Sequence, residues 1–195
     1  MLQEIRSAAI ALAAGAAISM LGSDELRAQY SKSFSFVGTQ KFGVELDSGD
    51  KKRSEWFKED VKSFSAFRAL CTALRIGAGT ATFGFEIYFA EPPKQNAKGY
   101  SLFLSTDSDK SPMTMGVRYW DIAKKKWEVV KQFNKKINVN ERFLVELIWT
   151  DKKMRFAVSD TESYELTLPQ PVNELYISAV TGNMRCQAAM GTATF

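Results

Sequence analysis

Alternation of apolar and polar residues in short segments is the feature of this sequence that most restricts its fold. Between Arg142 and Ala188 the pattern recurs four times, with polar turns such as Thr150–Lys153 between the segments. The alternating apolar positions are Phe143, Val145, Leu147 and Trp149; Met154, Phe156 and Val158; Tyr164, Leu166 and Leu168; and Leu175, Ile177 and Ala179. Alternation of period two, broken by turns every ~8–12 residues, is typical of an antiparallel β-sandwich.

The same pattern continues upstream, where Phe83, Phe85, Ile87 and Phe89 form the clearest buried face of the chain. Further strands are expected over 100–104, 113–119 and 127–133, which brings the total to about ten to twelve. Residues 32–46 predict a hairpin that turns at 38–40, and residues 54–74 predict a short helix or irregular turn before a strand over about 69–76. Trp120 and Asp121 are expected in the next loop.

We therefore expect an all-β fold, an antiparallel two-sheet jelly-roll sandwich over residues 30–195, preceded by an apolar segment over residues 1–29. This segment is alanine-rich, and its stretch from Ser7 to Leu21 carries no charge. Two interpretations remain open: a secretory signal, which implies an extracellular or surface location, or a packing or oligomerising helix of an intracellular protein. A transmembrane span is not expected, because it needs ~20 strongly apolar residues.

The absence of histidine narrows the chemistry. It excludes catalytic sites of the Ser-His-Asp and Cys-His type and most zinc sites. An oxygen-ligand calcium site stays possible, because it needs only carboxylates and carbonyls, but we predict no metal and no cofactor. A glycoside hydrolase would need a carboxylate pair on one strand. Glu45, Asp47 and Asp50 have a related spacing, but Ser48 and Gly49 favour a turn that would break that strand. The sequence therefore predicts a protein that is not an enzyme.

The charges bear on nucleic-acid binding, and the two cysteines on a disulfide. The net charge is +4, and the densest basic run is Lys124–Lys126, which is too short for a nucleic-acid surface, so no nucleic-acid partner is expected. Cys71 and Cys186 are far apart in the sequence and each lies in a strand-like segment. Whether they form a disulfide stays open, because the sequence does not give their distance.

From Leu74 onward the order of segments resembles the galectin carbohydrate-recognition domain, within the larger concanavalin-like group of lectin sandwiches. The residues that carry the resemblance are Phe143–Trp149, then Asp151, Met154–Val158, Leu166–Ile177 and Met184–Cys186. The resemblance implies a two-sheet sandwich with a sugar site on one concave sheet face.

The galectin sugar contacts are not retained. Phe103, Ser105 and Asp107 stand where the family has His, Asn and Arg, and the segment Gly116–Tyr119 lacks the asparagine of the next family strand. Trp127 matches the family tryptophan, whereas Glu128 and Lys131 do not match the spacing of the glutamate and arginine that follow it. Loss of such polar contacts argues against β-galactoside binding of the galectin kind.

The function expected from the resemblance is recognition of a glycan on the concave face, with stacking of a sugar ring on Trp127. The candidate ligand-binding residues are Trp127, Glu128, Lys131, Arg118, Asp107 and Ser105. The alternative is a structural or assembly protein that contacts another protein chain through edge strands, and oligomerises through the N-terminal segment. Both remain open on the sequence.

Overall fold

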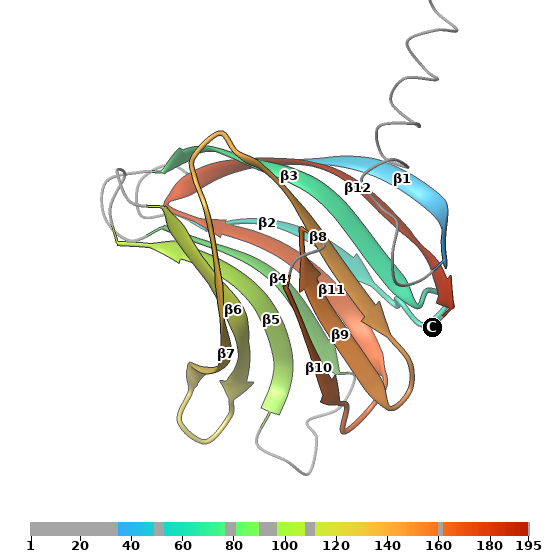
Figure 1. Ribbon diagram of the computed structural model, residues 1–195. Helices are drawn as coiled ribbons and strands as arrows, with labels where there is room; N and C mark the ends of the chain where they lie inside the picture. Colours follow the sequence, from blue (N-terminus) through green and yellow to red (C-terminus); the bar gives the residue numbers. More distant parts are fainter. Residues whose placement is uncertain are drawn as a thin grey trace, which may run out of the picture. The chain divides into compact units, whose positions relative to one another are not determined.

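The computed structural model describes residues 35–48, 53–76, 81–89, 97–107, 112–159 and 162–194. This part of the chain forms twelve β-strands and no helix (Figure 1). The strands are β1 (Ser35–Asp47), β2 (Arg53–Glu59), β3 (Ala66–Ile76), β4 (Ala81–Phe89), β5 (Ala97–Thr106), β6 (Met113–Asp121), β7 (Lys126–Ile137), β8 (Arg142–Trp149), β9 (Lys153–Val158), β10 (Glu162–Thr167), β11 (Val172–Val180) and β12 (Gly182–Thr194).

The strands form two six-stranded antiparallel sheets. Sheet A has the order β1-β12-β3-β8-β9-β10, and sheet B has the order β2-β11-β4-β5-β6-β7. Consecutive strands β4 to β7 are neighbours in sheet B, whereas β11 joins that sheet from near the end of the chain (Figure 1). The expected all-β, two-sheet antiparallel sandwich is confirmed.

The core lies between the two sheets and is aromatic. Phe83 and Phe85 of β4, and Phe143 of β8, are at most 1% exposed. Phe67 of sheet A contacts Phe85 of sheet B, with 6.2 Å between ring centroids. Because alternate residues of a strand point to opposite faces, the residues between these core positions on β4 lie on the outer face of sheet B.

The expected hairpin over residues 32–46 is wrong over the residues that the structure describes. Ser35–Asp47 is one continuous strand that pairs with β12, and its register shifts between Gly38 and Gln40. The turn-forming residues are thus accommodated as a bulge, which leaves one extra residue unpaired without reversing the chain.

The expected helix after Ser54 is wrong, whereas the alternative of an irregular turn is present at residues 60–65 and the expected strand over 69–76 lies within β3. Residues 53–59 form β2, which pairs with β11, and β3 begins at Ala66. Trp56 of β2 packs against the core and stacks on Phe42, with 4.6 Å between ring centroids, and Val61 is buried beyond the end of that strand. Sheet pairing outweighs local propensity here.

The two cysteines form a disulfide. Cys71 of β3 and Cys186 of β12 are direct cross-strand partners, and both side chains are at most 2% exposed. The bond joins two adjacent strands of sheet A across 115 residues of sequence.

The predicted apolar segment over residues 1–29 lies outside the described residues, so its two interpretations and the domain boundary at residue 30 stay predictions. Within the described ranges, no helix is long and apolar enough to cross a bilayer.

Candidate functional site

The outer face of sheet B carries an ordered grid of side chains, because cross-strand partners lie on the same face of a sheet. The row at one end of the sheet contains Glu174 of β11, Tyr88 of β4, Trp120 of β6 and Trp127 of β7. The next row contains Tyr176, Glu86, Ser101 and Arg118. The third row contains Ser178, Gly84, Phe103 and Gly116. Aromatic residues are therefore concentrated at one end of this face.

A pocket of about 330 Å³ lies at this aromatic end. It is lined by Tyr88, Lys98, Trp120, Trp127, Glu174 and Tyr176. We call it the aromatic pocket. All four of its aromatic side chains are half-buried, so they are held by neighbours and still reach solvent. Its volume lies at the lower end of the ~300–1,000 Å³ common for small-molecule sites.

The aromatic walls are two perpendicular pairs. Trp120 and Trp127 are cross-strand partners, with ring centroids 5.5 Å apart and planes at 75°. Tyr88 and Tyr176 lie diagonally across β4 and β11, with centroids 5.2 Å apart and planes at 83°. Edge-to-face pairs of this kind are favourable and hold both rings at a fixed angle.

Two charged side chains complete the pocket. Glu174 lies beside Tyr88 across the β11–β4 pair and forms no ion pair with any residue that the structure describes. Lys98 is exposed, and its ammonium nitrogen lies 5.5 Å from the centroid of the Tyr88 ring. A carboxylate that accepts hydrogen bonds and an ammonium group that donates them thus border the same aromatic surface.

A glycine next to the pocket permits this arrangement. Gly99 of β5 pairs with Tyr88, and a Cβ atom at residue 99 would lie 2.8 Å from Cδ1 of the Tyr88 ring and closer still to the carbonyl oxygen of Ile87. A side chain at this position would displace one wall of the pocket.

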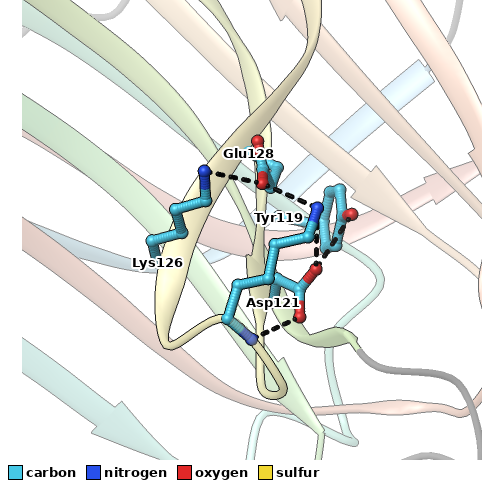
Figure 2. A network of polar contacts seen from close by, with 5 residues as sticks. Tyr119, Asp121, Lys126 and Glu128 are labelled. Carbon is cyan, nitrogen blue, oxygen red and sulfur yellow. Dashed lines mark hydrogen bonds and ion pairs between the residues drawn. The ribbon is translucent and has the colours of Figure 1, made fainter.

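The hairpin that joins β6 to β7 holds the two tryptophans together, and a polar network braces it (Figure 2). Asp121 accepts a hydrogen bond from the backbone nitrogen of Lys124 at 3.0 Å. Glu128 accepts one from the Lys124 side chain at 3.0 Å and pairs with Lys126 at 3.2 Å. Trp120 and Trp127 are the residues immediately beside this network.

These contacts shift the pKa values of the groups involved. The backbone hydrogen bond from Lys124 is the main reason that the pKa of Asp121 lies below its ordinary value of 3.8. Hydrogen bonds from Lys124 and then Lys126 lower the pKa of Glu128 from 4.5. The hydrogen bond with Glu128 raises the pKa of Lys124 above 10.5.

The hairpin is therefore expected to loosen only at the extremes of pH. Because the pKa values of Asp121 and Glu128 are lowered, the stability that these carboxylates contribute is fully present above their ordinary pKa values and is lost as the pH falls through the lowered values. Because the pKa of Lys124 is raised, its contribution is fully present below its ordinary pKa and is lost as the pH rises through the raised value. We expect the indole NMR signals of Trp120 and Trp127 to stay constant from about pH 5 to about pH 10, and to change below about pH 4. Glu128→Gln should remove part of the acid transition, whereas a transition near neutral pH would contradict the assignment.

The structure brings two of the sequence-predicted site residues together. The guanidinium of Arg118 lies 4.5 Å from the centroid of the Trp127 ring. Glu128 follows Trp127 on the strand and therefore faces the opposite side of sheet B, where it lies opposite Tyr119. Lys131 is exposed and pairs with Val117, whose side chain is in the core, so Lys131 also lies on that opposite side.

Ser105 and Asp107 lie at the other end of the sheet from the aromatic pocket. Ser105 is on the outer face of β5 next to Thr114, with 3.5 Å between their hydroxyl oxygens. Asp107 is exposed just beyond the end of β5. The structure therefore places neither residue beside Trp127.

Of the carboxylates considered for a glycoside hydrolase, Glu45 and Asp47 lie in sheet A, and Asp50 lies outside the described residues. Glu45 is on the edge strand β1 and forms an exposed ion pair with Arg185 at 2.8 Å. The strand ends at Asp47, and the hydroxyl of Ser48 donates a hydrogen bond to the carbonyl oxygen of Gly182 at 2.7 Å. The strand thus ends before Ser48, the rest of the expected turn lies outside the described residues, and Glu45 does not line the aromatic pocket.

Sequence reasoning missed most of the residues that line the pocket: Tyr88, Lys98, Trp120, Glu174 and Tyr176. The expectation that Trp120 belongs to a loop is wrong, because β6 continues to Asp121 and the chain turns over residues 122–125. A usable signal was present for Tyr88, because the core positions Phe83 to Phe89 on β4 require the intervening residues to face outward. The place of Glu174 depends on the pairing of β11 with β4, which no local pattern shows.

No protein-family profile matches this chain, and no curated protein is significantly similar to it in sequence. Solved structures do match. A structure from work on endo-acting O-glycanases of human gut microbiota that initiate mucin breakdown superposes with a TM-score of 0.53 at 9% identity, over 78% of this chain and 80% of that one. Lactose- and MES-liganded congerin II gives a TM-score of 0.48 at 8% identity, over 70% and 99%. The carbohydrate recognition domain of Emp47p gives 0.49 at 9% identity, over 83% and 90%.

The fold is a galectin- and concanavalin-like β-sandwich, as the resemblance in the sequence implies. The prediction that the chain is not an enzyme, made from the absence of histidine and the carboxylate spacing, is wrong as stated, because enzymes also use this fold. The sandwich that superposes with a TM-score of 0.53 comes from work on O-glycanases, which are enzymes. At 9% identity this similarity establishes the fold alone.

Proposed function

We propose that the protein binds a glycan in the aromatic pocket on the outer face of sheet B. The observation that supports this most directly is the composition of the pocket, with two tryptophans and two tyrosines beside one carboxylate and one ammonium group. A pyranose ring has an apolar face of C–H groups and a rim of hydroxyl groups. Aromatic rings pack against the apolar face, and charged side chains exchange hydrogen bonds with the hydroxyls.

The geometry gives each group a role. Trp120 and Trp127 offer two surfaces at 75°, which allows one ring to stack on the sugar while the other contacts its edge. Glu174 accepts hydrogen bonds from two neighbouring hydroxyls, and Lys98 donates to a ring or hydroxyl oxygen. Because the two tryptophans are already half-buried and packed against each other, they lose little side-chain entropy on binding.

One structural comparison agrees with this proposal. The matching sandwich from O-glycanase work shows that this fold serves proteins that act on glycans. In this chain the proposed contacts come from β4, β6, β7, β11 and Lys98 near the start of β5, and not from positions 103, 105 and 107 that the galectin motif implies. The ligand is therefore expected to differ from the β-galactosides that galectins bind.

Screening on a glycan array tests the proposal, with Trp127→Ala, Trp120→Ala and Glu174→Gln as pocket variants. We expect Trp127→Ala to weaken binding of the best-bound oligosaccharide by at least about thirtyfold, because truncation of a central aromatic contact costs ~2 kcal/mol or more. Glu165→Gln, on the exposed side of β10 in sheet A, is the matched control for Glu174→Gln and should leave binding unchanged. Thermal unfolding of each variant confirms that the fold is retained.

A second function, assembly with other protein chains, is favoured by one observation. Val129 and Val130 are 58% and 42% exposed on β7, an edge strand of sheet B. The same set of experiments separates the two functions. The assembly function would be supported, and glycan binding rejected, by two results together: no glycan binds, and the solution mass rises with protein concentration and falls in Val130→Ser.

A further inference from the structure

We infer that Glu86 and Arg118 are positioning residues, which hold opposite walls of the aromatic pocket in place without lining it. The inference concerns the pocket assigned to glycan binding and rests on that proposed function. Glu86 is 2% exposed on the outer face of β4, and the side chain of Arg118 on β6 is 15% exposed. Neither residue lines the pocket.

One end of this arrangement is the link from Glu86 to the tyrosine wall. The Tyr88 hydroxyl donates a hydrogen bond to Oε2 of Glu86 at 2.8 Å, and the hydroxyl of Ser178 donates to Oε1 at 2.9 Å. Tyr88 in turn packs edge-to-face against Tyr176. The carboxylate therefore sets the position of Tyr88 and, through it, the second ring of that wall.

The other end is the link from Glu86 to the tryptophan wall. Arg118 lies 3.9 Å from Oε1 of Glu86. Its guanidinium also lies 5.2 Å from the centroid of the Phe103 ring and 4.5 Å from that of Trp127. A guanidinium close to two aromatic rings is attracted to both. Arg118 therefore links the Trp127 ring to the carboxylate of Glu86.

The local backbone is adapted to this network. Gly84 precedes Glu86 on the same face of β4, and a Cβ atom there would lie 2.7 Å from Oε1 of Glu86 and 2.9 Å from Oγ of Ser178. A residue with a side chain at position 84 would push the carboxylate away from Ser178. The glycine leaves the space in which the carboxylate reaches both pocket walls.

Stability alone is a weak reason for a carboxylate at this place. A buried ion pair seldom stabilises a fold more than apolar residues of the same volume would, because both charges lose their hydration. Fixing four aromatic rings at defined angles is a benefit that apolar packing at residues 86 and 118 would not supply. Pre-organised rings bind a ligand more tightly, since fewer rotamers are lost on binding.

The test uses Glu86→Gln and Arg118→Met on the full chain, with Glu146→Gln as the matched control. Glu146 is also a buried glutamate with an arginine partner, Arg68, but it lies in sheet A, away from the pocket. We expect Glu86→Gln and Arg118→Met each to weaken binding of the best-bound array oligosaccharide about tenfold, which corresponds to ~1.4 kcal/mol. The double variant should lose no more than either single variant, because both act through one link.

A second readout needs no ligand. In Glu86→Gln, the indole NMR signal of Trp127 and the guanidinium signal of Arg118 should shift, because the ring and the charge separate. In Glu146→Gln these signals should stay where they are, although its free energy of unfolding falls. Unchanged Trp127 signals in Glu86→Gln would overturn the inference whether or not a glycan binds. Unchanged glycan affinity in both single variants would overturn it as well.

Discussion

Replacement of Cys71 and Cys186 together by alanine is expected to lower the free energy of unfolding by about 4 kcal/mol. The bond closes a loop of 115 residues, and in the chain-entropy account long loops gain most from closure because the cross-link restricts the unfolded chain. Both sulfur atoms are buried between β12 and β3, two inner strands of sheet A, so the bond lies within the paired core of the sheet.

Urea unfolding of the double variant and of the oxidised wild type measures this difference. The melting temperature should fall by on the order of 10 °C, given the size of the chain. Wild type unfolded with an excess of reducing agent is the control, and its unfolding free energy should approach that of the double variant. A difference below about 1 kcal/mol between oxidised and double-variant protein would show that the bond is not formed in solution.

The strands that the sequence identified are those with one face in the core. On β8 the expected positions Phe143, Val145 and Leu147 are all at most 1% exposed. Alternation is informative there because burial on one face selects apolar residues at every second position. The same reason explains the success on β4, β6 and β11.

The two strands that the sequence did not identify are the first two, and both lie at sheet edges. β1 and β2 are edge strands, of sheet A and of sheet B. An edge strand is held from one side only, and its sequence tolerates turn-forming residues such as Gly38 as bulges. Turn residues and a mixed apolar spacing therefore predicted a hairpin and a helix where tertiary pairing makes strands.

The site was predictable only in part, for a topological reason. Trp127 was singled out through the galectin resemblance, and Arg118 through its place on the neighbouring strand. The other half of the pocket is made by Tyr176 and Glu174 on β11, which reaches β4 from near the end of the chain. A local pattern carries no information on that pairing, so these residues appear only once the sheet order is known.

The same sheet order separates the pocket from the positions that the family motif implies. Ser105, which stands at the asparagine position of the galectin motif, lies beside Thr114 at the far end of β5 from the pocket. This position of the motif is therefore remote from Trp120. Phe103 instead serves as a platform for Arg118. With a glycan in the aromatic pocket, the choice of sugar depends on Lys98 and Glu174, and substitutions at residue 105 should leave that specificity unchanged.

The second large effect is expected in sheet A, where replacement of Arg68 by alanine should lower the free energy of unfolding by about 3 kcal/mol. Arg68 on β3 and Glu146 on β8 are cross-strand partners, and Nε of Arg68 donates a hydrogen bond to Oε1 of Glu146 at 2.6 Å. Their side chains are only 11% and 5% exposed. Removal of the cation leaves a carboxylate largely shielded from water beside the apolar Leu144 and Ile148.

Two further variants separate the cost of an isolated charge from the value of the pair. Arg68→Met combined with Glu146→Leu removes both charges, so its unfolding free energy should lie within about 1 kcal/mol of the wild-type value. The exposed pair of Arg185 and Glu45 has side chains 61% and 66% exposed, so Arg185→Ala should cost less than about 1 kcal/mol. Urea unfolding measures the free energy of unfolding of the wild type and of these three variants: Arg68→Ala, Arg68→Met combined with Glu146→Leu, and Arg185→Ala. If Arg68→Ala and Arg185→Ala lower the free energy of unfolding equally, water reaches Glu146, and burial does not set the strength of the ion pair between Arg68 and Glu146.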